Sequence, residues 1–228
     1  MEGPALGIAM PRSRPAVEVL SGQAPEAVRE IEGDFAMLES GRAAVRVWAC
    51  DAPAVVLGAS RDAAAEVHAG DCERLGVAVL RRASGGGTVM IGRGTVQYAF
   101  VLPSEEHGSR SLESVKRFCN GLVREALEAA GAVATLESDA WGDLKCGDVK
   151  VGGVALARRR HATLLHGTLL IDADLELVAS VLGHPAREPD YRRRRPHRDF
   201  LMNLGRIDAV AFEAALARAM RKTRNQPI

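Results

Sequence analysis

Apolar residues recur at helical spacing in three stretches of the chain. Between residues 25 and 41, Val28, Ile31, Phe35 and Leu38 follow one another at steps of three and four, which is the spacing of one buried helical face. The same pattern occurs in residues 111–131, where Ser111 is suited to cap the first turn, and in residues 208–221. These stretches predict three amphipathic helices.

Shorter apolar runs with many β-branched residues alternate with these helices. They predict strands at residues 44–50, 54–58, 77–81, 95–102, 133–136, 149–157 and 162–171. Two short helices are predicted at residues 71–75 and 174–182, and residues 187–198 form an arginine-rich, proline-containing loop. Strand pairs joined by tight turns, with helices between them, predict an α+β fold with flanking helices around a mixed, mainly antiparallel sheet.

Composition and charge narrow the function classes. Charged residues make up 26% of the 228 residues and the formal net charge is +1, so no bulk attraction to nucleic acid is expected. No apolar run approaches the roughly 20 residues of a membrane span, so we expect no membrane partner. The four cysteines form no Cys-x-x-Cys pair, which argues against a zinc ribbon or a disulfide framework and favours a cytoplasmic protein.

The chemistry centres on three consecutive glycines, Gly85, Gly86 and Gly87, which we call with Ser84 the glycine loop (residues 84–87). Without Cβ atoms, this backbone can come close to a ligand and turn its N–H groups toward an anion. Arg81 and Arg82 precede the loop and carry forked donors for a carboxylate or phosphate. A strand rather than a helix follows, and no Gly-Lys-Ser/Thr is present, so the loop is neither a P-loop nor a dinucleotide fingerprint. The alternative is a flexible hairpin loop.

Three later motifs add polar groups: Gly142-Asp143-Leu144, residues 150–153 (Lys-Val-Gly-Gly) and residues 166–170 (His-Gly-Thr-Leu-Leu). Lys150 stands in a strand beside two glycines, so its ammonium can reach a ligand that the glycines admit. Taken singly, Lys150 is more typical of a solvent-facing strand residue and His166 of a structural histidine.

Taken in order, the motifs resemble those of the lipoate-protein ligase family, in the superfamily that also contains biotin ligases and octanoyltransferases. The likeness covers residues 27–205. It implies a single biotin/lipoate ligase-like catalytic domain at residues 26–228, after a loose N-terminal leader at residues 1–25 with four prolines. We expect no C-terminal accessory domain of the kind that many lipoate ligases have. Either a separate small accessory subunit supplies it, or this is a compact form that works without one. Where the family carries His-Asp and then Gly-Asn, this chain has Ile91-Gly92 and Gly94-Thr95.

The resemblance implies an ATP-dependent lipoate-protein ligase. Lipoate and ATP, with Mg²⁺ on the triphosphate, would give lipoyl-AMP, and the lipoyl group would pass to a lysine of a carrier domain of a 2-oxoacid dehydrogenase or of the glycine-cleavage system. Lys150 matches the family's motif lysine and would be catalytic, and Asp143 would face the nucleotide or hold its Mg²⁺. The residues implied to bind the acyl group and ATP are Arg81, Arg82, Ser84, Gly85, Gly86, Gly87, Thr88, Asp143, Gly152, Gly153, His166 and Thr168.

Two alternatives remain open. An octanoyl or lipoyl transferase would need an activated thiol, yet the matching places fall at Thr135 and near residues 183–184, and Cys146 is interpreted as structural. A noncatalytic relative that binds an acyl-carrier domain would have no need of a lysine beside the glycines. Either catalytic reading requires the Lys150 ammonium and Gly85–Gly87 to meet in one pocket. The arginines at residues 192–195 are expected either to be solvated or to meet an acidic carrier.

Overall fold

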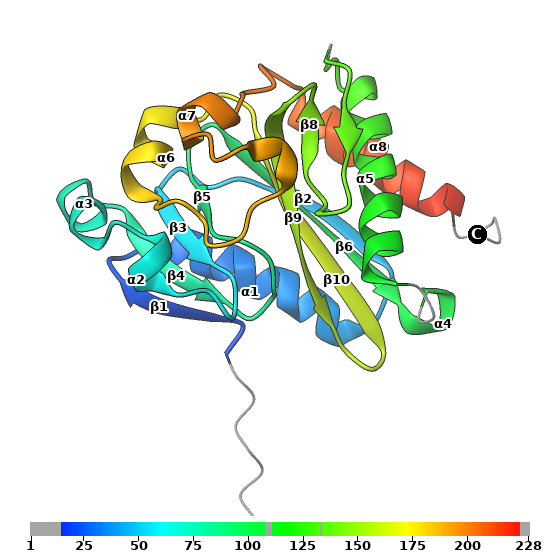
Figure 1. Ribbon diagram of the computed structural model, residues 1–228. Helices are drawn as coiled ribbons and strands as arrows, with labels where there is room; N and C mark the ends of the chain where they lie inside the picture. Colours follow the sequence, from blue (N-terminus) through cyan, green and yellow to red (C-terminus); the bar gives the residue numbers. More distant parts are fainter. Residues whose placement is uncertain (1–14, 108–110, 133, 224–228) are drawn as a thin grey trace, which may run out of the picture.

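The computed structural model describes residues 15–107, 111–132 and 134–223, which form two β-sheets with helices around them (Figure 1). The strands are β1 (Val17–Ser21), β2 (Ala44–Trp48), β3 (Ala54–Leu57), β4 (Ala78–Arg82), β5 (Val89–Ile91), β6 (Thr95–Pro103), β7 (Glu137–Ser138), β8 (Leu144–Cys146), β9 (Val149–Arg158) and β10 (Ala162–Leu170). The helices are α1 (Pro25–Ser40), α2 (Ala63–Glu66), α3 (Ala69–Arg74), α4 (Ser104–His107), α5 (Leu112–Ala129), α6 (Leu175–Val181), α7 (His197–Phe200) and α8 (Ala209–Thr223), with a 3-10 turn, η1, at Asp190–Arg192.

The larger sheet has the strand order β2-β6-β10-β9-β8-β7, and all its described pairs are antiparallel. Helices α5 and α8 cover one of its faces (Figure 1). Tyr98 and Phe100 of β6 are fully buried there against Phe212 of α8. Because side chains of a strand alternate between faces, Gln97, Ala99, His166 and Thr168 lie on the opposite face. That opposite face carries the polar residues.

The smaller sheet has the order β1-β4-β3-β5 and is mixed, since β3 and β4 run parallel while the two outer pairs are antiparallel. Strand β1 falls within residues 1–25, where a loose leader was expected, and it pairs along β4 up to Arg82. Helix α1 joins the two sheets. Its buried positions Ile31, Phe35 and Leu38 share one apolar cluster with residues of both sheets.

Most predicted elements are confirmed. Helix α1 begins at Pro25 and ends before Gly41, whose left-handed backbone suits glycine, and the Ser111 hydroxyl caps α5 by accepting from the N–H of Ser114. The predicted strand at residues 133–136 is wrong for its described part, because the strand in this region is β7, while Val133 lies outside the described residues. The arginine-rich loop contains η1 and the first two residues of α7, and neither element was predicted. No described helix has the length and apolarity needed to cross a membrane.

Candidate active site

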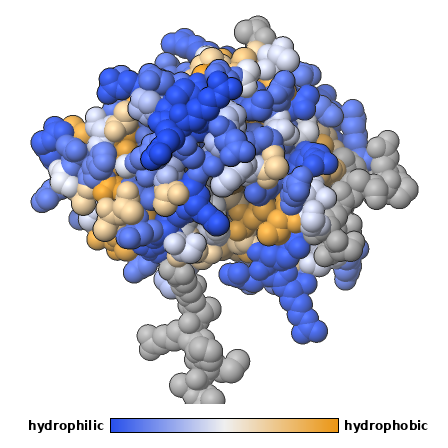
Figure 2. All heavy atoms as spheres, viewed as in Figure 1, coloured by the Kyte–Doolittle hydropathy of each residue, from blue (hydrophilic) through white to orange (hydrophobic). Residues whose placement is uncertain are grey.

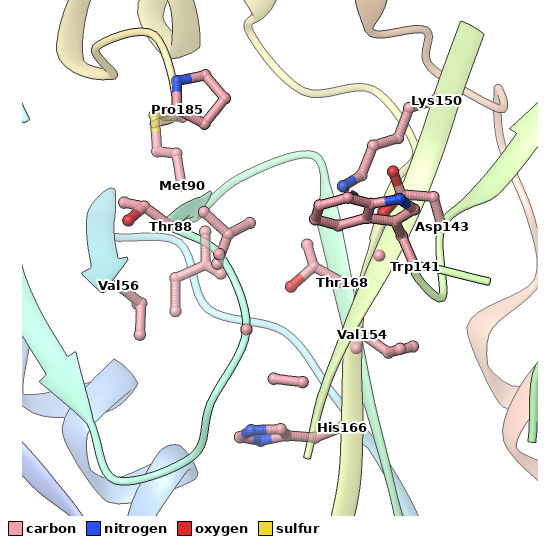
Figure 3. Close-up of a pocket in the computed structure, with 18 of the residues that line it drawn as sticks. Val56, Thr88, Met90, Trp141, Asp143, Lys150, Val154, His166, Thr168 and Pro185 are labelled. Atoms are coloured by element: carbon pink, nitrogen blue, oxygen red, sulfur yellow. Dashed lines mark ion pairs between the residues drawn. The ribbon is translucent and has the colours of Figure 1, made fainter. Parts of the chain in front are cut away.

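A cavity of about 490 Å³ lies where the two sheets face each other (Figure 3). The glycine loop lines one side and strands β9 and β10 line the other, while residues between Pro185 and Leu201 close a third side. Lys150, Gly86 and Gly87 are all lining residues, so the structure brings the predicted lysine and the predicted loop together. Apolar side chains, among them Val56, Met90, Val154 and Leu156, cover much of the remaining wall. Such a wall suits an aliphatic chain.

Arginine side chains fix the direction of three successive peptide groups in the glycine loop. Arg82 Nη2 donates to the carbonyls of Gly85 at 2.9 Å and Gly87 at 2.7 Å, and Arg61 Nε donates to the carbonyl of Gly86 at 2.9 Å. In a trans peptide the N–H points opposite to the carbonyl. The N–H groups of Gly86, Gly87 and Thr88 therefore point away from these arginines, and no backbone carbonyl of the described residues accepts from them. They are available to an anionic ligand.

Arg82 shapes the loop from inside the protein. Its guanidinium also donates from Nη1 to the Val56 carbonyl at 2.9 Å and from Nε to Ser84 Oγ at 2.9 Å, so every nitrogen of the group has a protein acceptor. Burial, and then the nearby charge of Arg61, lower the pKa of Arg82 to about 10, which leaves it charged at neutral pH. Arg82 also lines the cavity, as the sequence predicted for a ligand-binding residue, and its contacts hold the backbone of the glycine loop. Its contact with the ligand stays a prediction.

Arg81 and Ser84 do not line the cavity. Arg81 Nη1 donates to the carbonyl of Arg61 at 2.6 Å and to that of Gly58 at 3.3 Å, so it supports the turn that carries Arg61. Ser84 is fully buried, and its Oγ lies 2.7 Å from His166 Nε2. Both residues are one layer behind the lining residues that they help to position.

Lys150 forms an ion pair at the cavity wall. Its Nζ lies 2.6 Å from Asp143 Oδ1, and Figure 3 shows the two side chains together beside Trp141. Gly153 lies next to this ammonium group: a Cβ built at Gly153 would come within 2.8 Å of Lys150 Nζ. The missing side chain at this position makes room for the ammonium group. Gly152, Gly153 and Thr168 line the cavity, as the sequence predicted for ligand-binding residues.

Both oxygens of Asp143 are engaged by side chains. Oδ1 faces Lys150, and Oδ2 accepts a hydrogen bond of 3.0 Å from the hydroxyl of Tyr191. Burial of the phenol, followed by the charge of Asp143, raises the pKa of Tyr191. Among the described residues no group of three or more metal-binding side chains is found. Asp143 is the partner of Lys150 in this arrangement, and its predicted contact with the nucleotide or Mg²⁺ stays a prediction.

Sequence reasoning missed several residues of the site. Asp34 on α1 lines the cavity and places Oδ2 3.0 Å from His166 Nδ1. Its signal was a carboxylate on the buried face of an amphipathic helix, beside Ile31 and Phe35. Arg61 and Glu66 form an ion pair of 3.3 Å, and the Thr88 hydroxyl donates to Glu66. They follow β3 in a segment whose sequence carries no comparable signal.

The sequence of residues 35–222 matches the family described as "Lipoyl protein ligase A/B catalytic domain". This chain belongs to that family. The match spans most of the chain, and it contains the cavity residues from Val56 to Leu201.

Known relatives include both ligases and transferases. The chain is 28% identical over 130 residues to lipoate–protein ligase 1 of Staphylococcus aureus, covering 57% of this chain and 38% of that protein. It is 26% identical over 171 residues to octanoyltransferase LipM of Brevibacillus brevis, covering 65% of this chain and 61% of that protein. The chain thus spans less than two thirds of the length of these relatives, and they do not decide between ligase and transferase.

Solved structures share the fold. A bi-partite lipoate protein ligase from Thermoplasma acidophilum, studied with its E2 lipoyl domain, superposes with a TM-score of 0.67 at 23% identity, covering 84% of this chain and 76% of that chain. A lipoate-protein ligase A bound with ATP superposes with a TM-score of 0.63 at 24% identity, covering 84% and 78%. The predicted α+β fold of the biotin/lipoate ligase type is therefore confirmed.

Proposed function

We propose that this chain is the catalytic domain of an ATP-dependent lipoate-protein ligase. It would join lipoate to ATP as lipoyl-AMP, with release of pyrophosphate, and then pass the lipoyl group to a lysine amine of a carrier domain. The observation that carries the proposal is the shared cavity of Lys150 and the glycine loop. The Lys150 ammonium and three peptide N–H groups that point away from the arginines of the loop meet there beside an apolar wall.

The proposed roles follow from where charge develops in the reaction. When the lipoate carboxylate attacks the α-phosphate, negative charge grows on the phosphate oxygens, and fixed donors lower that barrier without reorganisation. Lys150 would contact the oxygens between the acyl carbonyl and the phosphate, with Asp143 holding its ammonium in place at 2.6 Å. The N–H groups of Gly86, Gly87 and Thr88 would bind the remaining anionic oxygens. His166 and Thr168 would line the acyl chain's part of the cavity.

A thioester-using transferase is the second candidate, because octanoyltransferase LipM is among the relatives. That chemistry needs a thiol beside the acyl carbon. No cysteine lines the cavity within the part of the chain that the structure describes: Cys50, Cys72 and Cys119 are buried elsewhere, and Cys146 packs toward the core under α5. Thr135 is exposed and does not line the cavity. These positions favour the ligase.

We further propose that the acceptor is a lipoyl domain of a 2-oxoacid dehydrogenase or of the glycine-cleavage system, since one structural neighbour was solved with its E2 lipoyl domain. A separate accessory subunit, cytoplasmic location and Mg²⁺ bound to the triphosphate complete the proposal.

The deciding experiment measures lipoate-dependent exchange of labelled pyrophosphate into ATP, with octanoate as a second acid. Exchange supports the ligase. No exchange, together with transfer of an octanoyl group from acyl carrier protein to a lipoyl domain, would establish the transferase instead. Binding of the carrier domain without either reaction would identify a noncatalytic relative. A lipoyl domain whose acceptor lysine is replaced by arginine serves as the negative control for the transfer assay.

A further inference from the structure

A chain of four buried polar side chains runs from α1 to the glycine loop. Asp34 Oδ2 lies 3.0 Å from His166 Nδ1, His166 Nε2 lies 2.7 Å from Ser84 Oγ, and Ser84 Oγ accepts from Arg82 Nε at 2.9 Å. Asp34 and Ser84 are fully buried, and His166 and Arg82 are less than a tenth exposed. This row of hydrogen-bonded side chains ends at the carbonyls of Gly85 and Gly87, which accept hydrogen bonds from Arg82.

The partners fix the direction of every proton in this chain. Arg82 can only donate, so Ser84 Oγ accepts from it, and the Ser84 hydroxyl must send its own proton elsewhere. Within the described part of the protein, the sole remaining partner of that hydroxyl is His166 Nε2. His166 Nε2 is then an acceptor, and Nδ1 carries the ring proton and donates it to Asp34. The three donors between these side chains, Arg82 Nε, the Ser84 hydroxyl and His166 Nδ1, therefore each have one acceptor.

We propose that Asp34 is a positioning residue that sets the tautomer of His166 and, through Ser84 and Arg82, the direction of the peptide groups in the glycine loop. Asp34 touches no part of the loop itself. Its carboxylate requires the proton on Nδ1, which leaves Nε2 free to accept from Ser84. The loop's role in holding the acyl-phosphoryl group rests on the proposed function, but the tautomer does not.

Two further donors make a carboxylate necessary at position 34. Trp48 Nε1 donates to Asp34 Oδ1 at 3.1 Å, and Arg46 Nη1 lies 3.4 Å from the same oxygen. An asparagine would keep its carbonyl toward these donors, because the opposite orientation places N–H groups against N–H groups. Its amide would then donate to His166 Nδ1. The ring proton would move to Nε2, where it faces Ser84 Oγ, and the Ser84 hydroxyl would lose its acceptor.

The experiment compares the wild-type protein with the near-isosteric variant Asp34→Asn. Two-dimensional ¹⁵N–¹H spectra of the imidazole groups at neutral pH identify which nitrogen is protonated, and the signals of His166 are assigned by their loss in His166→Gln. We expect protonated Nδ1 in the wild-type protein and protonated Nε2 in Asp34→Asn. In Asp34→Asn, kcat/KM for lipoate in the exchange assay should also fall by roughly tenfold to a hundredfold, because a slight displacement of the glycine loop from its productive position costs that much.

Glu30→Gln is the matched control. Glu30 lies one turn before Asp34 on α1 and also forms an ion pair with Arg46, but it has no contact with His166. This variant should retain the wild-type tautomer and, because the pair is partly exposed, change kcat/KM by less than about twofold. An equal loss in Glu30→Gln and Asp34→Asn would assign the effect to Arg46 and overturn the proposal.

Ser84→Ala breaks the chain at its centre and provides a second test. If the four residues act as one unit, Ser84→Ala and Asp34→Asn should lower kcat/KM similarly, and the double variant should be no worse than either single variant. Additive losses, normal kcat/KM in Ser84→Ala, or a wild-type spectrum with protonated Nε2 would each overturn the proposal. Absence of exchange in the wild-type protein would refute the proposed function, while the spectra would still decide the tautomer.

Discussion

At the scale of single residues, the proposed chemistry depends on Lys150, a cation with a defined partner. Lys150 reaches the cavity from β9 over Gly153, and Asp143 and Tyr191 fix it from the neighbouring segments. The arrangement holds the ammonium in one direction, which is what a group acting on a developing oxyanion requires. Lys145, one strand away on β8, offers a comparison: it forms its own ion pair of 2.6 Å with Glu137 but does not line the cavity.

Replacing Lys150 should abolish the chemistry without unfolding the protein. In Lys150→Met the aliphatic part of the side chain is kept and the charge is removed, so we expect adenylate formation to fall by about 10²–10³-fold, as for loss of an oxyanion donor. Lipoate-dependent pyrophosphate exchange measures the rate, and a thermal melt checks the fold. Lys145→Met is the control and should keep near-normal exchange. Near-normal exchange in Lys150→Met would contradict the catalytic role.

At the scale of elements, two neighbouring glycines of the glycine loop are required for different reasons. Gly86 has φ +95°, and a Cβ there would approach Arg82 Nη2 to 2.9 Å, so this position needs glycine for folding. Gly87 has no positive φ, and a Cβ there would meet no atom within 4 Å. Because Gly87 lines the cavity, this open space belongs to the cavity in which we propose the ligand binds.

This difference predicts that two neighbouring substitutions both weaken binding but differ in their effect on stability. Gly87→Ala should leave the melting temperature within a few degrees of the wild type and weaken lipoate and ATP binding by about tenfold or more, since a methyl group occupies ligand space. Gly86→Ala should lower the melting temperature as well as binding, because alanine is strained at this φ. Calorimetric titration and thermal melts measure the two quantities. Equal binding in Gly87→Ala and the wild type would show that the ligand does not approach this part of the loop.

Helix α7 contributes a histidine that is neutral in the folded protein. Burial, and then the charges of Arg192, His184, Lys150 and His68, lower the pKa of His197 from about 6.5 to about 4. The unfolded chain binds this proton below about pH 6.5 and the folded chain only near pH 4. The folded state is therefore destabilised as the pH falls through this window, by up to roughly 3 kcal/mol.

Replacing His197 by glutamine should flatten this pH dependence. The unfolding free energy from urea titrations at pH 7, 6, 5 and 4 should fall less steeply in His197→Gln than in the wild type, and the two curves should differ mainly between pH 6.5 and 4. His161→Gln is the comparison, since His161 lies on the β9–β10 turn, away from this cationic group. Parallel curves for His197→Gln and the wild type would refute the lowered pKa.

At the scale of the whole molecule, the sequence predicted most elements and several residues that line the cavity, but not how the elements assemble. Periodicity located α1, α5 and α8, since each has one apolar face. The division of β2 and β3 between different sheets was not predictable, because short apolar strands carry no mark of their partners. Asp34, Arg61 and Tyr191 were missed for the same reason: each reaches the site through a contact between segments distant in the sequence.

The arginines at residues 192–195 show that the sequence also did not predict which charged side chains are exposed. Of these consecutive arginines, Arg192 and Arg195 lie against the ring of Phe200, at 4.7 Å and 5.5 Å from its centre, and serve the fold. Arg193 and Arg194 are exposed, and both have left-handed backbones, φ 53° and 58°, that the hydrogen bond from the Arg194 N–H to Glu188 helps to hold. Figure 2 shows hydrophilic side chains gathered over this part of the surface. Two exposed cations therefore follow Arg192, which lines the cavity.

We predict that Arg193 and Arg194 attract an acidic carrier domain. Arg193→Asn and Arg194→Asn remove the charges, and asparagine tolerates the left-handed backbone better than most residues. Together they should raise KM for the carrier about tenfold at low salt and leave pyrophosphate exchange unchanged, because exposed charges act on encounter rather than on chemistry.

The salt dependence gives the sharper test of this docking surface. Raising ionic strength to several tenths molar should weaken carrier modification by the wild type and bring it toward the double variant, since charges farther apart than a Debye length are screened. Arg160→Asn, on the β9–β10 turn remote from the cavity, should behave as the wild type at every salt concentration. If instead the double variant keeps the wild-type salt dependence, the carrier reaches Lys150 by another face. The two arginines are then solvated side chains with no part in docking.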